Sequence, residues 1–365
     1  YALPASGRRA AAWWAASGVC TGLALFSKYS SVLTMGGAVL YLVASPSHRH
    51  WLRRPQPYLA AMLAVLVFSP VLIWNATHGW ASFAFQGDRA MGFRFRPLMP
   101  FQTLGGEALF VLPWLWVPMM IVWVRSFQSD AAWSHRLLAW LATPPIIVFA
   151  LISAWSSQRI LYHWAAPGYL MLFPLLGDAI ARRSDRAWVR RTLAGSAALI
   201  LVTLTVIACQ IQFDWLGGTL STVMRKDPTA EGLDWISLGD ELRARGLLPP
   251  GTIAAALNWR DAGKIGRGLG PDVTMLCLSS DSRQFGFADP LRKYAGRDVL
   301  LLSVDPVPRA MEEARHWFQN VDVLPPDSVR LDGRVLGTIS VLHGHGLQPD
   351  TAPAARLGSP PRNSD

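Results

Sequence analysis

Long apolar stretches, each close to the length needed to cross a membrane, most strongly constrain the fold of this chain. The hydrocarbon core of a bilayer is about 30 Å thick and requires about 20 mostly apolar helical residues, because backbone polar groups cannot stay unpaired there. The first two stretches are short and are joined only by Ser27, Lys28 and Tyr29, which favours a tight hairpin. We therefore expect seven membrane helices, near 10–27, 30–45, 57–76, 104–124, 136–155, 164–181 and 192–212.

The distribution of charge divides the chain at Gln212. Residues 1–212 contain 17 Lys and Arg but 5 Asp and Glu, whereas residues 213–365 contain 17 and 19, so the net charges are +12 and −2. Because the basic residues belong to the apolar part, the net charge of +10 does not indicate a nucleic-acid-binding surface. We expect a transmembrane helical region over 1–212, an external α/β domain over 213–346 and a disordered tail over 347–365.

The orientation in the membrane follows from Lys and Arg in the short loops, which favour the cytoplasmic side. One set of alternating loops contains five cations: Lys28, Arg89, Arg94, Arg96 and Arg159. The other set contains twelve: Arg8, Arg9, Arg49, Arg53, Arg54, Arg125, Arg136, Arg182, Arg183, Arg186, Arg190 and Arg191. This asymmetry predicts that the larger set is cytoplasmic and that the polar C-terminal part lies outside, in a periplasm-like compartment.

The cations on the outer side need a separate explanation, because the same rule predicts that they should be scarce there. Lys28 lies at a hairpin tip, where a lone cation can anchor the helix at the interface or bind a phosphate. Residues 78–96 combine Phe and Trp with Arg89, Arg94 and Arg96, a pattern that suits lipid headgroups. Ordinary headgroup anchoring explains this pattern equally well.

Three further polar residues lie at the outer ends of apolar stretches. Glu107 is one turn into the fourth stretch, so we expect it to face the bundle interior or water, either in a direct role or paired with an outer-loop arginine. Arg159 and His163 precede the sixth stretch, which Pro167 can begin because its missing N–H would be unpaired in the first turn. His163 is either a hydrogen-bonded anchor or part of a site.

After Gln212 the apolar stretches shorten to the length of strands. We expect strands at 252–257, 273–278 and 299–304 and helices at 233–245 and 308–318, an alternation typical of a small α/β domain. Two local patterns carry less information. The glycines at 266, 268 and 270 lack the spacing of a dinucleotide site, and His343 with His345 is a metal-ligand pair without nearby partners, for which we expect a turn at a strand end. The cysteines, Cys20, Cys209 and Cys277, form no disulfide or metal-binding pattern.

Several separated motifs together resemble a known family. They are Gly22-Leu-Ala-Leu-Phe-Ser-Lys28-Tyr29-Ser, Pro70-Val-Leu-Ile-Trp74-Asn75 followed by Trp80, Phe83, Gln86 and Arg89, His163-Trp164-Ala-Ala-Pro167-Gly-Tyr169, and Asn258-Trp259-Arg260-Asp261-Ala-Gly263-Lys264. In this order they resemble the ArnT-like, protein-mannosyltransferase-like membrane glycosyltransferases of family 39, which have the GT-C fold. The resemblance covers most of residues 10–180 and part of the C-terminal region.

The resemblance implies transfer of a sugar from a polyprenyl-phosphate donor to an envelope acceptor on the outer side of the bacterial inner membrane. It assigns the donor phosphate to Lys28, Tyr29, Gln86 and Arg89, with Arg159 and His163 on the same side. The family's catalytic carboxylate lies in its first outer loop, so we expect the base upstream of Tyr1, with Glu107 as a candidate within the chain. The donor is a substrate, and neither a cofactor nor a metal is implied.

Two other classes of function remain open from the sequence. A transporter requires ionisable groups near the middle of the bilayer and repeated halves, whereas Glu107 and Asp178 lie near the ends of their stretches. A non-catalytic scaffold of an envelope-assembly complex would keep the same helices without the acidic catalytic group. The sequence predicts membrane lipids, a lipid-linked sugar and an envelope acceptor as partners, but the sugar and the acceptor cannot be identified from it.

Overall fold

The computed structural model describes residues 2–90, 95–156, 160–213, 215, 235–331 and 334–349. The chain packs as two units, Tyr1–Ala197 and Ala198–Asp365, which are described separately. The division falls inside one long helix, while the domain boundary expected at Gln212 remains a prediction. The expected tail at 347–365 lies largely outside the described residues.

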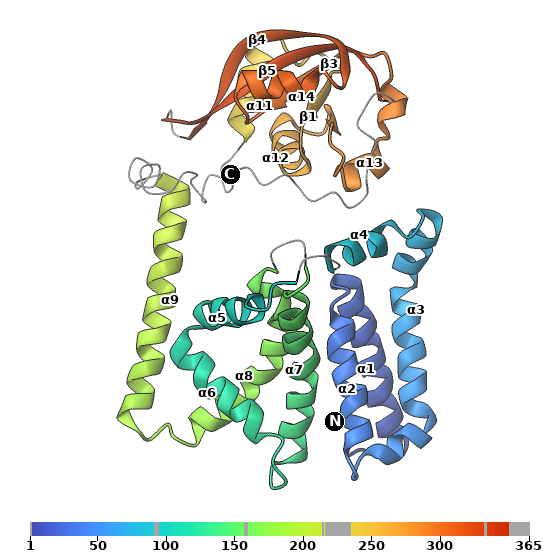
Figure 1. Ribbon diagram of the computed structural model, residues 1–365, viewed down its shortest axis with the longest axis vertical. Coiled ribbons are helices and arrows are strands. Elements are labelled where there is room, and N and C mark those ends of the chain that lie inside the picture. Colours follow the sequence, from blue (N-terminus) through green and yellow to red (C-terminus); the bar gives the residue numbers. More distant parts are fainter. Residues whose placement is uncertain are drawn as a thin grey trace. The chain divides into compact units, whose positions relative to one another are not determined.

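The first unit is helical (Figure 1). Its first helical segments in chain order are α1 (Gly7–Ser27), α2 (Ser31–Ala44), η1 (Arg49–Arg53), α3 (Pro55–Thr77) and α4 (Ala81–Ala90). They are followed by α5 (Met99–Val111), α6 (Pro113–Arg125), α7 (Trp133–Ile152), η2 (Tyr162–Ala165), α8 (Ala166–Ala181) and the first part of α9 (Ala187–Phe213), the helix in which the two units divide. Many large apolar side chains on these helices face outward, such as Met62 at 67% and Phe101 at 72% exposure. A surface of this kind is suited to lipid.

Among the described residues, five helices are long and apolar enough to cross a membrane, or six if one bent pair is a single span. The chain is therefore a multi-pass membrane protein, as expected, although seven spans were predicted. The expected span at 104–124 corresponds to the bent pair, in which α5 and α6 meet at an angle of 113°, as a broken span or a re-entrant segment would. The break lies at Leu112, whose φ is +78°, and Pro113 starts α6. Proline has no N–H and cannot continue the preceding helical hydrogen bonds.

Small residues allow close helix packing in this unit. A Cβ atom on Gly18 of α1 would overlap the backbone of Ala60 in α3, and one on Gly37 of α2 would overlap the carbonyl oxygen of Trp140 in α7. Helices in lipid gain little from the hydrophobic effect between them, so they rely on close van der Waals contact. These glycines hold α1 against α3 and α2 against α7.

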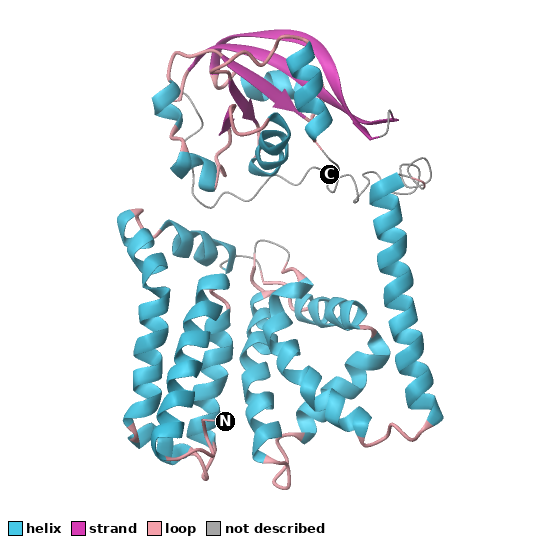
Figure 2. Ribbon diagram, turned by 180° about the vertical axis from the view of Figure 1, so that it is seen from behind, coloured by secondary structure: helices cyan, strands magenta, loops and turns pink. Residues whose placement is uncertain are grey.

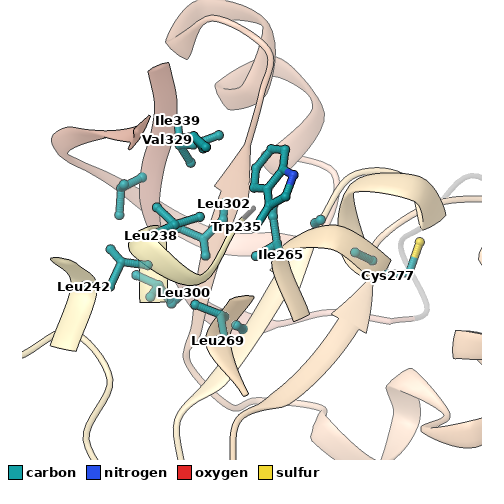
Figure 3. Packing of buried hydrophobic residues seen from close by; sticks show 14 residues of the cluster. Trp235, Leu238, Leu242, Ile265, Leu269, Cys277, Leu300, Leu302, Val329 and Ile339 are labelled. Carbon is teal, nitrogen blue, oxygen red and sulfur yellow. The ribbon is translucent and has the colours of Figure 1, made fainter. Parts of the chain in front are cut away.

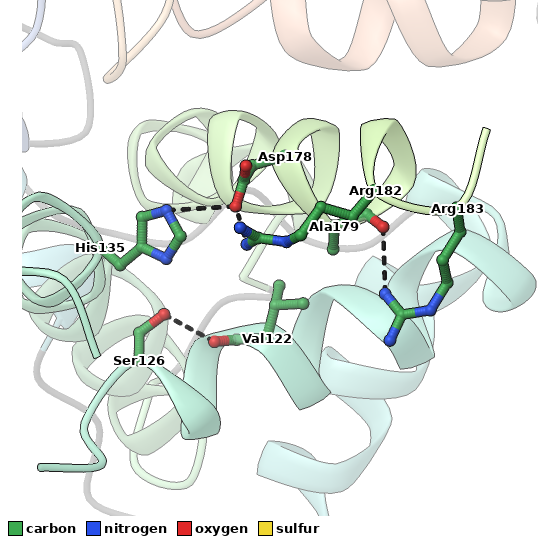
Figure 4. Close-up of polar contacts among 7 residues, drawn as sticks. All are labelled: Val122, Ser126, His135, Asp178, Ala179, Arg182 and Arg183. Carbon is green, nitrogen blue, oxygen red and sulfur yellow. Dashed lines mark hydrogen bonds and ion pairs between the residues drawn. The ribbon is translucent and has the colours of Figure 1, made fainter. Parts of the chain in front are cut away.

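A polar cluster lies where α7 begins and α8 ends (Figure 4). Asp178 of α8 lies 3.3 Å from Nε2 of His135 in α7 and also accepts a hydrogen bond from Arg182. Arg183 donates to the carbonyl oxygen of Ala179 over 3.1 Å. Arginines near the C-terminal end of a helix satisfy carbonyl groups that lack helical partners. The arginine-rich turn after α8 therefore has a structural role at this end of the bundle.

The second unit contains a mixed sheet among its described residues, coloured magenta in Figure 2. Its strands are β1 (Ile253–Ala256), β2 (Thr274–Cys277), β3 (Val299–Ser303), β4 (Phe318–Leu331) and β5 (Arg334–Leu347). The strand order is β2-β1-β3-β5-β4, with β1 parallel to β2 and β3, and β5 antiparallel to β3 and β4. The helical segments are α11 (Ile236–Ala244), α12 (Trp259–Leu269), α13 (Gln284–Ala288), η4 (Leu291–Tyr294) and α14 (Val307–Ala314).

Two apolar layers cover the faces of this sheet. On one face, Leu238 and Leu242 of α11 and Ile265 and Leu269 of α12 pack on Leu300 and other strand residues (Figure 3). The other face holds Leu301 and Leu342 against residues of α14. The three expected strands are confirmed.

Two sequence predictions in this unit differ from the structure. The helix expected at 308–318 is too long, because α14 ends at Ala314 and Phe318 already begins β4. His343 and His345, expected at a turn, lie inside β5 and pair with residues on the neighbouring strands. The long antiparallel pair β4 and β5 was not predicted at all.

Candidate functional site

Several connections meet at one end of the helical unit. Since successive helices alternate in direction, α1, α3 and α7 finish at the same end at which α2 and α8 begin. Figure 1 shows α4 lying across this end of the bundle, where α1 and α3 finish. All the described outer-side residues predicted from the sequence therefore belong to this end of the unit.

Lys28 and Tyr29 form the turn between α1 and α2. The Lys28 N–H donates to the carbonyl oxygen of Ala24 over 2.9 Å and ends α1, and its carbonyl oxygen accepts from Ser31 N–H at 3.0 Å. Within the described part of the chain, the Lys28 ammonium has no hydrogen bond or ion pair to a protein group, and the residue is exposed. The backbone of Lys28 is thus fixed while its charge remains available to a ligand.

Tyr29 connects this turn to two later helices. Its ring stacks on Phe83 of α4, with centroids 5.2 Å apart and planes at 15°, and meets the Phe68 ring of α3 edge-on at 5.8 Å. Both arrangements are favourable geometries for aromatic pairs. The Tyr29 ring therefore holds α4 against the turn that carries Lys28.

Asn75 builds the corner between α3 and α4. Its side chain is fully buried, its Nδ2 donates to the Val71 carbonyl at 2.9 Å, and its Oδ1 accepts from Ser82 N–H at 3.0 Å. Trp80 adopts a φ of +58° in the turn between the helices, and its N–H donates to the Asn75 carbonyl at 2.7 Å. Asn75 supplies a partner for an N–H at the start of α4, where helical partners are lacking.

Helix α4 carries the next predicted phosphate-binding residues. Gln86 lies in α4 and is exposed. Arg89 also belongs to α4, but its side chain is outside the described part, as is the whole of Arg94. The structure thus brings Lys28, Tyr29 and the helix containing Gln86 and Arg89 to one place.

Arg96 does not extend to a lipid surface as the Phe and Arg alternation predicted. Its backbone N–H donates to the Ala154 carbonyl at 2.8 Å, and its guanidinium donates to the Ser156 carbonyl. Both acceptors follow α7, so Arg96 fastens the start of α5 to the end of α7. The prediction that Arg96 contacts lipid headgroups was wrong, because carbonyl groups after α7, which lack helical partners, accept the hydrogen bonds of Arg96 instead.

Glu107 faces the interior of the unit, as expected, but its partner is not an arginine. The Glu107 side chain is 2% exposed, and its Oε2 accepts a hydrogen bond from the Tyr169 hydroxyl at 2.7 Å. The same hydroxyl accepts from Trp116 Nε1 at 3.0 Å. The other carboxyl oxygen, Oε1, has no hydrogen-bond partner among the described residues. These hydrogen bonds connect α6, α8 and α5, which indicates a structural role for Glu107. Its Oε1 atom remains able to accept a further hydrogen bond.

His163 lies in η2, immediately before α8, and is exposed. Pro167 occupies the first turn of α8, as predicted. The neighbouring Tyr162 ring lies so close to Gly106 that a Cβ atom there would overlap it, which packs η2 against α5. Arg159 lies outside the described residues, so its convergence with His163 stays a prediction.

The contacts described above form two groups. One joins the turn of Lys28 and Tyr29 to α4, and the other joins α5, which contains Glu107, to η2 and α8. Sequence analysis missed Tyr162 and misassigned the partner of Glu107. Among the described residues, the one group of three potential metal ligands lies in the second unit, not at this end.

Comparison with known proteins gives one family match. Residues 2–74 match the model described as dolichyl-phosphate-mannose-protein mannosyltransferase. This segment contains α1, α2 and most of α3, and so includes Lys28 and Tyr29 but not α4 or η2. No curated protein and no solved structure matches the chain. Residues 2–74 of this multi-pass membrane chain are thus similar to the dolichyl-phosphate-mannose-protein mannosyltransferase family, a family of glycosyltransferases that use a lipid-linked sugar donor.

Proposed function

We propose that the protein is a membrane glycosyltransferase that moves a sugar from a polyprenyl-phosphate donor to an envelope acceptor on the outer side of a bacterial inner membrane. The acceptor is a lipid, a glycan or a protein. The observation that carries this proposal is the Lys28 ammonium, which has no partner among the described residues and lies on a turn packed against α4, within the segment that matches the family.

The chemistry of the reaction suits this arrangement. When the sugar leaves its carrier, the bond from the anomeric carbon to the phosphate oxygen breaks and negative charge develops on the lipid phosphate. A positioned ammonium or guanidinium stabilises such charge most strongly where water is partly excluded. Lys28 provides the ammonium, while Gln86 and Arg89 on α4 add a hydrogen-bonding amide and a second charge.

The surroundings of Lys28 also suit a lipid carrier. The Tyr29, Phe68 and Phe83 rings pack together beside it, and Trp80 is 52% exposed at the start of α4. Aromatic side chains favour the boundary between headgroups and hydrocarbon. A polyprenyl chain would remain in the bilayer while its phosphate reached the turn.

The orientation rests on the asymmetry of loop charges. We propose that Arg49–Arg54 and Arg182–Arg191 are cytoplasmic and that the second unit is external, on the acceptor side. Single cysteines introduced at Arg186 and at Asp281, with the native cysteines replaced by serine, would be labelled in intact cells with an impermeant maleimide. Labelling at position 281 alone is expected, whereas labelling at position 186 alone reverses the topology.

Transfer assays of the full-length protein with a polyprenyl-phosphate sugar test the proposed function. Lys28→Ala and Arg89→Ala each remove a charge-assisted contact worth about 1.5–3 kcal/mol, so each should lower catalytic efficiency about 10–150-fold. Arg53→Ala and Arg54→Ala are the matched controls, because these residues are equally basic and lie at the other end of the bundle. Their efficiency should stay close to that of the wild type.

Amounts of folded protein in the membrane must be equal in all four variants. Equal losses at both ends would mean that the cations serve insertion and not the donor. Wild-type efficiency in Lys28→Ala would reject the proposed donor site. If the wild type itself neither binds nor transfers the donor, the scaffold interpretation replaces the enzyme.

A further inference from the structure

Three neighbouring strands of the second unit bring two histidines and two aspartates together. His343 and His345 are two residues apart on β5, so their side chains lie on the same face of the sheet. Asp322 of β4 pairs with His343 in the strand register. Asp298 directly precedes β3, whose residues Val299 and Leu300 pair with Gly344 and His343. These four residues, Asp298, Asp322, His343 and His345, are here called the His–Asp cluster.

The contacts in the His–Asp cluster are specific. His345 Nδ1 lies 3.0 Å from Asp298 Oδ2, and His345 Nε2 lies 3.0 Å from Asp322 Oδ2. The Gly346 N–H donates to Asp298 Oδ1 at 3.1 Å, which fixes that carboxylate. The His343 ring stands beside the His345 ring, with centroids 4.4 Å apart. One imidazole is therefore held between carboxylates from both neighbouring strands.

The His–Asp cluster has the composition and spacing of a metal site. One ligand atom from each of Asp298, His343 and His345 can be chosen so that all three lie within 4.8 Å of one another. Two imidazoles and a carboxylate favour zinc and similar transition metals over magnesium or calcium, which prefer oxygen ligands alone. The side chains of Asp298 and His345 are 53% and 34% exposed, so an ion can reach them from solvent.

We propose that Asp298, His343 and His345 bind a divalent transition metal ion of the zinc type, and that Asp322 orients His345. In this arrangement the metal ion would bind His345 through Nδ1 beside Asp298, and any proton on Nδ1 would be released to solvent. His345 Nε2–H then donates to Asp322, the outer carboxylate that metal-bound histidines usually have. A water molecule completes the coordination.

The expected consequence is a clamp across the sheet. The ligands come from β5 and from the residue before β3, so one ion joins these two neighbouring strands, and Asp322 connects β4 to the site through its contact with His345. An ion that binds the folded state and not the unfolded state raises the temperature of unfolding. This inference is independent of the proposed glycosyltransferase function, because it concerns neither the donor end nor the helical unit.

The test uses the 365-residue chain, purified in detergent without a histidine tag. Zinc binding is measured by competition with a chromophoric chelator, and cobalt binding by its visible absorption bands. One zinc ion per chain is expected, together with a rise in the unfolding temperature of the second unit. His345→Ala, His343→Ala and Asp298→Asn should abolish both effects, whereas Asp322→Asn should weaken binding about 10–100-fold.

His316→Ala is the matched control, because His316 lies in the same unit outside the His–Asp cluster. It should bind zinc like the wild type. Circular dichroism separates loss of binding from loss of folding. His343→Ala removes a ring that makes no hydrogen bond to the described residues, so this variant is expected to disturb folding least. The absence of saturable binding in the wild type, or wild-type affinity in both His343→Ala and Asp298→Asn, would overturn the proposal.

Discussion

The ring of Tyr29 stacks on that of Phe83, with centroids 5.2 Å apart and planes inclined by 15°. This pair joins the turn between α1 and α2 to α4, two segments that the sequence separates by all of α2 and α3. The family match ends at residue 74, before Phe83. The contact therefore links the matched segment to the helix that carries Gln86 and Arg89.

Phe83→Ala should lower transfer activity although every polar residue of the proposed donor site remains. Stacked aromatic pairs contribute about 0.5–1.5 kcal/mol beyond the area they bury, so we expect catalytic efficiency to fall roughly 2–13-fold. Steady-state kinetics of Phe83→Ala and the wild type would measure this loss of catalytic efficiency. Phe101→Ala is a suitable control, because this ring is 72% exposed on α5. Equal activity of the two variants would mean that α4 does not position the donor.

Tyr169→Phe should destabilise the helical unit. The Tyr169 hydroxyl donates to Glu107 Oε2 and accepts from Trp116 Nε1, so its removal leaves the buried Glu107 carboxyl and the partly buried Trp116 ring without these partners. Each buried unsatisfied group costs about 1–3 kcal/mol. Thermal unfolding in detergent should therefore occur at a lower temperature than in the wild type.

Glu107→Gln serves as the comparison, because the amide oxygen can still accept from Tyr169. Near-wild-type stability and activity in this variant would support a structural role for Glu107, while loss of activity with stability retained would make Glu107 part of the reaction. Wild-type stability of Tyr169→Phe would show that the hydrogen-bond chain contributes little.

Two adjacent glycines in α2 offer a matched test of helix packing. A Cβ at Gly37 would overlap the carbonyl oxygen of Trp140 in α7, whereas one at Gly36 would meet nothing within 4 Å. Gly37→Ala should cost about 1–3 kcal/mol, the usual range for overpacking, because the obstacle is backbone. Gly36→Ala should be neutral or slightly stabilising, since alanine favours helix over glycine. The folded yield and the unfolding temperature of the two variants in detergent test this difference. Similar values for both variants would contradict the close approach of α2 and α7.

Composition and hydrophobic pattern predicted the membrane bundle and three strands of the second unit, because these features depend on local sequence. The bend at Leu112 was not predicted, although Pro113 stood inside the expected span. Proline is common within membrane helices, where neighbouring groups can satisfy the freed carbonyls, so its presence alone does not indicate a break. Pro70 of α3 illustrates this, since that helix continues through it.

The candidate site was predicted only in part, for a related reason. The position of Lys28 at an outer turn follows from the two flanking apolar stretches, but the partners of Arg96 and Glu107 depend on segments distant in sequence. His343 lacked a predictable partner in the same way, because Asp298 becomes its neighbour only once β3 pairs with β5. Cross-strand pairing of this kind leaves no local signal.

Cys277 should react with thiol reagents far more slowly than an ordinary cysteine. The residue lies on β2 and is 1% exposed, and burial, with the negative charges of Asp281 and Asp261, raises the pKa of its thiol to about 12. The thiolate is the reactive form, so at pH 8 only about one thiol in 10,000 would be reactive, against roughly a quarter for a pKa near 8.5.

The raised pKa of Cys277 determines how its rate of alkylation depends on pH. Below a pKa of about 12 the thiolate fraction increases about tenfold per pH unit, so the rate of alkylation should keep rising between pH 7 and 10 without a plateau. The measurement uses Cys20→Ser with Cys209→Ser, which leaves Cys277 alone, and maleimide labelling followed by mass spectrometry. A cysteine introduced at Asp240, whose side chain is 70% exposed, is the control and should level off near pH 9. In denaturant the two cysteines should react alike. If Cys277 in the folded protein levels off together with the control, the thiol is neither buried nor electrostatically suppressed, and the packing of β2 in the sheet would have to be revised.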